Sequence, residues 1–340
     1  TMDTLEEKCI DLYFGGNKEV AHEAMQLPMG EKVYMRDASF DYVSRTDVTP
    51  ILDEMTSDFL GETFTPKEWA DRNEDEFKLF MKVDDTGKEE IIGFCLLAYQ
   101  GIDTDDKDDP RNSPLVGNIW WFAIRKKFRG QGYGTAIYPY ILKYLKNEKH
   151  MRAVITTYRA KNVPAGKLYM KFGLKPYGEV IQIPHRPGSA LTKLPEGFDF
   201  YKSGEKVGSR VKDELDEFVK NHMSCKGPDW ISSSVFNISG KNAFMLRRDE
   251  TGKIVSLVTM NTRMFNESDS GGDKPQMVGN LFYPMATDER EFKLLMDTAL
   301  HIKAFDKVNS VYCVFGKEHP YKGILYKYGK TTSIKLAKKL

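Results

Sequence analysis

Three glycines stand within five residues at Gly130, Gly132 and Gly134, between a predicted strand and a predicted helix. A glycine-rich turn leaves the backbone uncrowded, so successive amide N–H groups can point at one anion. The positive end of the helix dipole lies at the same place and favours negative charge there. The spacing therefore predicts a phosphate cradle built from main-chain amides.

The same stretch argues against two familiar nucleotide motifs. No Gly-Lys-Ser/Thr follows the glycines, as a Walker loop requires. The full GxGxxG spacing and an acidic residue for a ribose are also lacking. Binding of nucleoside triphosphates or NAD through this loop is therefore disfavoured.

The hydrophobic pattern places elements on both sides of the cradle. Residues 118–124 are alternating and aromatic, which predicts a strand, and residues 136–145 have the apolar spacing of a helix. A further strand is expected at residues 153–158, and a short helix then ends at Gly173. The cradle is thus expected at the junction between a strand and the helix that follows it.

In this setting the sequence resembles the GNAT superfamily of acyl-CoA N-acyltransferases. The cofactor loop of that family reads Arg/Gln-x-x-Gly-x-Gly/Ala, and Arg129, Gly132 and Gly134 match it. A later family segment has Asn and Ala ahead of a helix that carries Tyr and then Gly-Phe. Its positions are matched by Asn162, Ala165, Tyr169 and Gly173, with Leu174 in the Phe place. The resemblance covers residues 31–183 directly.

The resemblance implies that acetyl-CoA is the cofactor and that its pyrophosphate lies on the amides of the glycine loop. The residues implied there are Arg129, Gly130, Gln131, Gly132, Tyr133, Gly134 and Thr135. The pantetheine arm is expected to pair like an extra strand with the backbone of Phe122, Ala123 and Ile124. Asn162, with Ala165 beside it, is expected to hold the pantetheine or the loop.

The resemblance also implies direct acyl transfer with Tyr169 as the general acid for the departing thiolate. A tyrosine packed on the sheet with its hydroxyl tethered is the alternative. A backbone N–H near Ala123 or Ile124 is expected to meet the oxyanion. Residues 118–124 contain no carboxylate and no imidazole, so we expect water-relayed deprotonation through Asn118 or an acid of loop 103–109.

Trp120 and Trp121 are adjacent on the predicted strand and must face opposite sides of it. One of the two can line the acceptor cleft while the other packs in the core. Alternation does not choose between them, and we assign Trp120 to the acceptor site.

An internal repeat organises the chain. Residues 84–88 (DDTGK) return as 249–253 (DETGK), and residues 115–122 (LVGNIWWF) return as 277–284 (MVGNLFYP). Near the end of each copy, LYMKFG is echoed by LYKYG. Matches in the same order predict two copies of one fold.

The predicted organisation follows from the repeat. We expect a helical N-terminal extension at 1–30, a catalytic domain at 31–183, a Pro- and Gly-rich linker at 184–196 and a second domain at 197–340. The fold class is α/β (α+β), with two tandem GNAT-like domains, each a mixed, mostly antiparallel sheet flanked by helices. Residues 287–294 have no glycine and three carboxylates where a phosphate would lie, so the second domain is expected to be degenerate.

Composition excludes several classes of protein. The 50 basic and 49 acidic residues give a formal net charge of +1, which disfavours nucleic acid and anionic membranes as partners. No apolar run approaches the ~20 residues that cross a bilayer, and the first residues are acidic, so we expect a cytoplasmic, intracellular protein. Four scattered cysteines are expected as reduced thiols, and six dispersed histidines predict no metal site.

The sequence therefore predicts an acetyl-CoA-dependent N-acetyltransferase that acts on an amine, with a small amine favoured. Two alternatives remain open at this stage. One is a non-catalytic acyl-CoA binding protein, and the other is a longer-chain protein N-acyltransferase that resembles N-myristoyltransferases. The identity of the acceptor and the oligomeric state are left open by the sequence.

Overall fold

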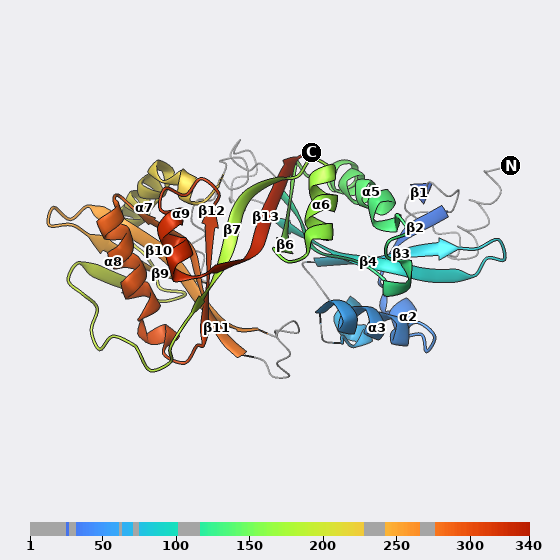
Figure 1. The fold of residues 1–340 in the computed structure, drawn as a ribbon, viewed down its shortest axis with the longest axis horizontal. Coiled ribbons are helices and arrows are strands. Elements are labelled where there is room, and N and C mark those ends of the chain that lie inside the picture. The colour runs from blue at the N-terminus through green and yellow to red at the C-terminus, as the bar shows by residue number, and fades with distance from the viewer. Residues whose placement is uncertain are drawn as a thin grey trace. The chain divides into compact units, whose positions relative to one another are not determined.

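The structure of the chain is a computed structural model that describes residues 25–26, 32–60, 63–70, 75–100, 116–227, 242–265 and 276–340. The chain divides into two compact units (Figure 1). The first contains the described residues up to 100, together with 116–156 and 338–340, and the second contains 157–337. Within the described part, no helix combines the length and the apolar character that crossing a membrane needs.

The first unit alternates strands and helices. Its elements are β1 (Met25–Gln26), β2 (Lys32–Asp37), α2 (Phe40–Val43), α3 (Thr49–Leu60), α4 (Pro66–Ala70), β3 (Asp75–Val83), β4 (Glu89–Gln100), β5 (Val116–Ile124), the 3-10 turn η1 (Lys126–Phe128), α5 (Tyr133–Asn147) and β6 (Ala153–Arg159), whose last residues belong to the second unit.

The strands of the first unit lie in the order β1-β2-β3-β4-β5-β6. All neighbours are antiparallel except β5 and β6, which are parallel. Helix α5 lies on one face of the sheet, and α2 and α3 lie on the other (Figure 1). On the second of these faces, Leu52 and Met55 of α3 and Trp69 of α4 pack with Phe77 and Phe94 in one apolar core. The predicted mixed, mostly antiparallel sheet is confirmed.

The second unit has the same alternation. Its elements are α6 (Val163–Lys171), β7 (Lys175–Pro184), β8 (Phe198–Tyr201), α7 (Ser209–Asn221), the 3-10 turn η2 (Met223–Cys225), β9 (Ala243–Arg248), β10 (Ile254–Phe265), β11 (Gln276–Ala286), α8 (Glu289–Leu300), the 3-10 turn η3 (Lys303–Phe305), β12 (Ser310–Gly316), α9 (Lys322–Tyr328) and β13 (Lys330–Lys339).

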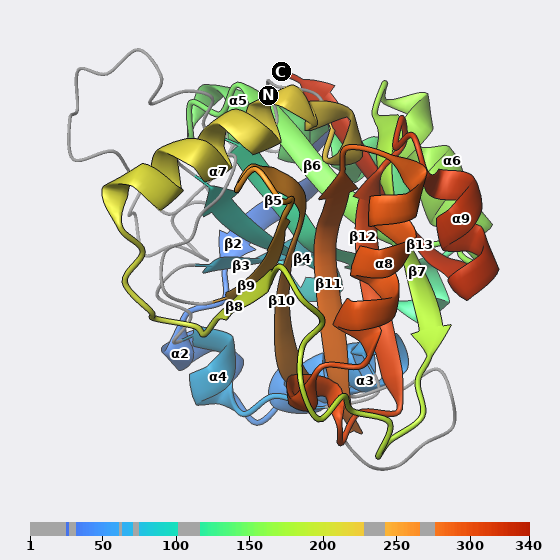
Figure 2. The same cartoon turned by 90° about the vertical axis from the view of Figure 1, so that its left-hand side faces the viewer.

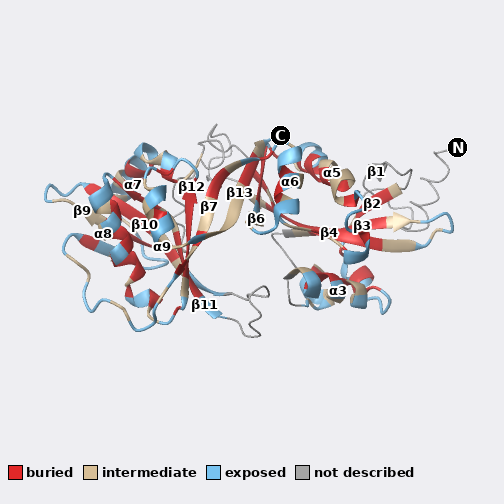
Figure 3. Cartoon of the chain, in the orientation of Figure 1, coloured by how far each residue is buried: buried red, intermediate tan, exposed pale blue. Residues whose placement is uncertain are grey.

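The strand order of the second unit is β13-β7-β12-β11-β10-β9-β8, and only β11 and β12 among these neighbours are parallel. Helix α8 lies against β10 and β11 (Figure 2). The helices pack on the sheet through two apolar cores. One lies beneath α8 around Phe292 and Leu295, and the other lies beneath α7 around Leu215 and Val219. Figure 3 shows buried residues concentrated along the strands and on the helix faces turned to them.

The repeat is visible in the hydrogen bonds of the two acidic turns. Asp84 Oδ1 accepts from the backbone N–H groups of Thr86 and Lys88 at 2.9 and 3.0 Å. Asp249 Oδ1 accepts from Thr251 and Lys253 at the same two distances. A glycine at φ +82° closes each turn, so the two turns that match in sequence also match in backbone conformation and hydrogen bonding.

Two matched glycines show why the repeat keeps them. A Cβ on Gly117 would lie 2.9 Å from the side chain of Leu145, and one on Gly279 would lie 2.8 Å from the ring of Phe305. In both copies the glycine lets an apolar side chain approach the backbone of the strand. Any larger residue at either position would push that side chain away.

The compact units do not follow the predicted boundary near residue 183. Strand β7 falls almost wholly within the predicted first domain (31–183), but it lies in the second unit, with β12 on one side and β13 on the other. Backbone pairing therefore groups it with the C-terminal half, although the sequence repeat assigns it to the first copy. Met25 and Gln26 form a strand paired with β2 and not a helix. The polar loops at 103–114 and 266–275 lie outside the described residues.

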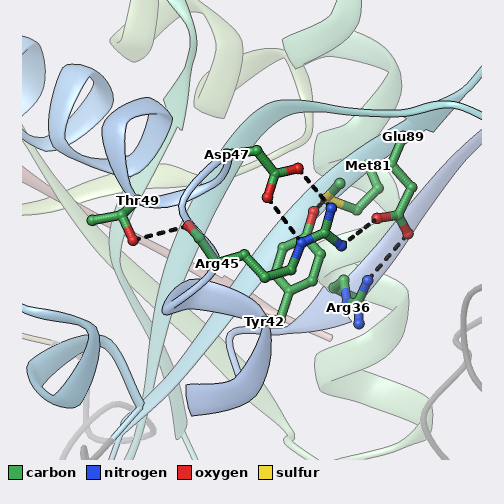
Figure 4. Close-up of polar contacts among 7 residues, drawn as sticks. All are labelled: Arg36, Tyr42, Arg45, Asp47, Thr49, Met81 and Glu89. Carbon is green, nitrogen blue, oxygen red and sulfur yellow. Dashed lines mark hydrogen bonds and ion pairs between the residues drawn. The ribbon is translucent and has the colours of Figure 1, made fainter.

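A charged cluster ties β2 and α2 to the start of β4 (Figure 4). The Arg36 guanidinium lies 3.8 Å from the centre of the Tyr42 ring and 3.1 Å from Glu89. Arg45 pairs with Asp47 at 2.6 Å. Burial raises the pKa of Glu89, and the nearby Arg36 and Arg45 oppose that rise. Because cations and carboxylates are paired within the cluster, we assign it a structural role.

Candidate functional site

Strand β5 changes register in the middle of its length. Leu96 of β4 lies opposite Trp121, but Leu97 lies opposite Ile119, so Trp120 is an extra residue in β5. Such a bulge bends a strand and turns one side chain out of the regular alternation. Here it leaves Trp120 48% exposed. Trp121 packs in the core, with its ring centre 5.8 Å from that of Phe64.

Beyond the bulge, one edge of β5 no longer pairs with β6. The parallel pairs run from Val116 with Ala153 to Ile119 with Thr156, and the described ladder ends there. The Thr156 hydroxyl donates to the Ile119 carbonyl at 2.8 Å and marks the point where the strands separate. The main chain from residue 120 to 124 therefore presents an edge to which an extended ligand can add.

The glycine loop connects β5 to α5 and has the conformation expected of a main-chain cradle. Gly130 and Gly132 have φ values of +76° and +89°, and a Cβ at either position would meet nothing within 4 Å. Gly132 is the N-cap of α5, and because it has no side chain it cannot cap the helix with a side-chain hydrogen bond. Gly134 and Thr135 lie in the first turn of α5, where helix geometry leaves backbone N–H groups without an intrahelical acceptor. An anion can therefore bind at the N-terminus of α5.

The side chains of the other loop residues pack against or hydrogen-bond to neighbouring parts of the first unit. Tyr133 is 3% exposed and its ring lies 5.4 Å from that of Phe128, so its side chain packs at the start of α5. Gln131 donates its side chain to the Lys127 carbonyl at 2.7 Å. Arg129 donates Nε to the Ile124 carbonyl at 2.7 Å, which uses one of the acceptors expected for pantetheine. The side chain of Arg129 therefore holds the loop against the strand.

The neighbouring positions of β5 are placed as follows. Asn118 lies one residue before the end of the β6 ladder, opposite Ala98 and Ile155. Phe122 packs between Phe80 and Tyr138, at ring distances of 5.9 and 5.7 Å. Its side chain is thus a sheet contact, and its backbone remains the part available to a ligand.

Asn162, Ala165 and Tyr169 lie in the second unit, on α6. Asn162 is the N-cap of that helix and accepts from the Ala165 N–H at 3.3 Å, so the segment first serves to start the helix. Tyr169 is 6% exposed, and its ring lies 6.3 Å from that of Tyr158 in an edge-on arrangement. Its repeat counterpart, Tyr326, is 44% exposed and donates its hydroxyl to Glu179 at 3.0 Å.

The second copy has closed its counterpart of the cradle. The Asp288 carboxylate caps α8 by accepting from the Glu291 N–H at 2.9 Å. Glu291 itself pairs with Arg247 at 2.6 Å. A carboxylate of the chain therefore occupies the helix end where α5 has a bare glycine, and it would repel a phosphate.

The space between β11 and β12 is also filled. Their parallel pairs end at Phe282 with Val314, and η2 contacts both strands. A Cβ on Gly316 would lie 2.7 Å from the Ser224 carbonyl, which shows how closely η2 approaches. At the position matching Phe122 the second copy has Pro284, which has no N–H to offer a ligand. The chain itself thus fills the opening in this copy.

A buried histidine, His319, binds the backbone of β11 at the same place. His319 is 1% exposed, and its Nε2 donates to the Pro284 carbonyl at 2.8 Å. Its Nδ1 accepts from the Tyr321 N–H at 3.0 Å, a pattern that requires the neutral ring. Burial lowers the pKa of His319 to about 4, against a smaller rise from the bond to Pro284.

The folded state should therefore lose stability on mild acidification. A histidine whose folded pKa lies below its unfolded value contributes stability that is fully present above the unfolded pKa and lost as pH falls. From pH 6.5 to 4, the window set by the printed pKa values, His319 is expected to cost about 3 kcal/mol of unfolding free energy. Urea unfolding at both ends of that window measures it. A His319→Gln variant, which can keep both hydrogen bonds without titrating, should lose less stability; an equal loss would contradict the assignment.

Sequence reasoning missed three charged residues near the cradle. Arg125, at the end of β5, is 8% exposed and pairs with Glu54 of α3 at 2.9 Å. Asp58, one turn further along α3, pairs with Arg129. The signal was the i, i+4 spacing of two carboxylates, but nothing in the sequence showed which cations they meet. Cys95 and Cys313 are fully buried.

Comparison with protein families gives one match. The family model described as Acetyltransferase (GNAT) family matches residues 47–174, which include α3, the bulged β5, the glycine loop and α6. A comparison with curated proteins finds no match. The matched segment thus contains every element of the site described above.

Solved structures show the fold over most of the chain. A GCN5-related glucosamine N-acetyltransferase region of a fungal multi-domain GH3 β-N-acetylglucosaminidase is 16% identical, with a TM-score of 0.53. The match covers 90% of this chain and 38% of that one, so this chain spans well under half of that protein. A GCN5-related N-acetyltransferase from Sphaerobacter thermophilus has a TM-score of 0.48 at 15% identity, covering 90% of this chain and 95% of that one. Saccharomyces cerevisiae N-myristoyltransferase with bound myristoyl-CoA has 0.47 at 10%, covering 95% and 82%.

Proposed function

Because residues 47–174 match the family model described as Acetyltransferase (GNAT) family, we propose that the chain transfers the acetyl group of acetyl-CoA directly to an amine. The proposal extends the family's general acyl-CoA-dependent chemistry to one acyl group and to an amine acceptor. A small amine is favoured over a basic protein tail because the net charge of the chain is only +1.

The observation that carries the proposal is the bare N-terminus of α5. A 15-residue helix begins at a glycine, which has no side chain to cap it, and the two loop glycines at positive φ have open space where a Cβ would lie. An uncapped helix end costs stability unless something else meets its N–H groups. A pyrophosphate would supply that partner, and Asp288 supplies it in the second copy.

The free edge of β5 fits the rest of the cofactor. The pantetheine arm has amide groups that can pair with the main chain at Phe122 and Ala123, past the point where β6 separates from β5. The thioester oxygen becomes negative during attack, and the backbone near Ala123 or Ile124 is our candidate to meet it. A backbone N–H there would stabilise that charge as it develops.

The chemistry then needs two proton transfers. The attacking amine must be neutral and lose a proton, and water held near Asn118 is our candidate relay. The departing thiolate must gain one, and Tyr169 is our candidate donor, since a phenol of pKa ~10 can protonate a thiolate whose thiol has a pKa of ~8.5 when the two are held together. Trp120, exposed beside the bulge, is our candidate for an acceptor contact.

Calorimetric titration with acetyl-CoA, CoA and myristoyl-CoA tests the cofactor. We expect one site per chain with an acetyl preference, because the second copy has filled its own cleft. Two sites or a preference for myristoyl-CoA would overturn that expectation. An amine panel that includes glucosamine, followed by release of free thiol, tests transfer; cofactor binding with no release from any amine would favour a binding protein.

A further inference from the structure

We infer that Glu54 and Asp58 of α3 are positioning residues that clamp the glycine loop and hold its amides ready for the cofactor. The clamp is a pair of ion pairs, Arg125 with Glu54 and Arg129 with Asp58. The inference rests on the proposed function, because it concerns how the same loop becomes competent to bind CoA.

The first ion pair fixes the start of the loop. Arg125 directly follows β5 and donates Nη2 to Glu54 Oε2 at 2.9 Å. Its Nη1 donates to the Ile91 carbonyl at 3.2 Å, and its backbone N–H donates to the Ile92 carbonyl at 2.7 Å. Because the side chain is 8% exposed, the Glu54 carboxylate offsets a cation that would otherwise be buried without charge compensation.

The second ion pair fixes the loop next to the glycines. Arg129 donates Nη2 to Asp58 Oδ2 at 2.5 Å, and its Nε donates to the Ile124 carbonyl at 2.7 Å. One guanidinium therefore connects the helix, the end of β5 and the loop at the residue just before Gly130. A lysine could not make both contacts, because it lacks the planar fork.

The helix provides a rigid base for both contacts. Glu54 and Asp58 are four residues apart, so they lie on one face of α3. The opposite face is anchored in the core through Leu52 and Met55, and Phe59 packs edge-on against Phe94 with ring centres 5.9 Å apart. The two arginines bracket η1 at four-residue spacing, which matches the spacing of the carboxylates. The loop is thus held at two points of one turn of helix.

The clamp matters because two loop glycines otherwise make the backbone mobile. If the loop is competent only part of the time, the apparent dissociation constant rises by the inverse of that fraction. Loss of the Asp58 contact to the exposed Arg129 is expected to weaken CoA binding about threefold, and loss of the Glu54 contact to the buried Arg125 about tenfold.

The test uses Asp58→Asn and Glu54→Gln with matched controls. Asp47→Asn removes the carboxylate of another exposed Arg–Asp pair in the same unit, and Glu291→Gln removes one from a largely buried pair in the other unit. Asp58→Glu keeps the charge and should restore affinity. CoA affinity is measured by calorimetry, and hydrogen exchange of residues 125–135 is measured without ligand.

We expect weaker CoA binding and faster exchange of the loop in both clamp variants, and neither change in the controls. Tighter CoA binding by Asp58→Asn would overturn the clamp, since it would mean that Asp58 competes with the cofactor for Arg129. Unchanged affinity and exchange would overturn it as well. If the wild-type chain binds no CoA while the clamp variants exchange faster, the clamp stands and the proposed function fails.

Discussion

A Gly132→Asp variant is expected to lose at least a hundredfold in CoA affinity while remaining folded. The substitution places a carboxylate at the N-cap of α5, beside the first-turn amides. The new side chain would then compete with the pyrophosphate for the same amides and repel it, and a unit charge within ~4 Å is worth about 4 kcal/mol near a protein surface. Calorimetry with CoA, beside thermal unfolding, measures both parts of the expectation.

The matched control is Gly252→Asp. Gly252 has a φ of +82° and, like Gly132, open space around an added Cβ. Both variants therefore carry a similar backbone strain, about 1–2 kcal/mol for an L-residue in this region. Only the first changes the cradle. Equal CoA affinity in wild type and Gly132→Asp would show that the phosphate binds elsewhere, and an equal loss in both variants would assign the effect to strain.

A Tyr169→Phe variant is expected to lower kcat for acetyl transfer by about a hundredfold or more, with little change in KM for acetyl-CoA. The reason is that only the hydroxyl is removed, while the ring packed against Tyr158 is kept. A proton donor acts on the departing thiolate in the transition state and contributes little to binding the intact thioester. Steady-state kinetics with a good acceptor, followed by thiol release, gives both constants.

Tyr326→Phe is the control that the repeat provides. It removes the corresponding hydroxyl from α9 and with it the bond to Glu179, at a stability cost of about 1 kcal/mol. Its kcat should equal that of the wild-type chain. If Tyr169→Phe also keeps its kcat and loses only stability, the Tyr169 side chain packs against the sheet with its hydroxyl tethered. The proton for the thiolate then comes from another group.

The degeneracy expected of the second copy has a physical basis beyond its missing glycines. The sequence indicated three carboxylates in place of a phosphate, and one of them, Asp288, caps the helix. Two further contacts close this copy near Pro284 of β11. Ser224 of η2 lies about 60 positions before Pro284, and His319, which bonds to its carbonyl, lies 35 positions after it. Contacts between residues so distant in sequence depend on how the chain returns over the sheet.

The sequence by itself determined the repeat, the acidic turns, the strand and helix around the glycine loop and the mixed sheet, because each follows from local spacing. Short-range rules of this kind act within one turn or one pair of strands. It also predicted a phosphate cradle at the glycines of a strand-to-helix junction, and that assignment stays a prediction.

Tertiary structure decided what holds that cradle in place. The bulge that exposes Trp120 depends on the register between β4 and β5, which no spacing within β5 alone reveals. The pairing of Arg125 with Glu54 and of Arg129 with Asp58 joins residues 71 positions apart. Strand β7 joined the sheet of the C-terminal half because its two pairing edges meet β12 and β13 there. Contacts between distant residues depend on which strand edges still lack a backbone partner, and which charged side chains still lack an ion-pair partner, once the local elements have formed.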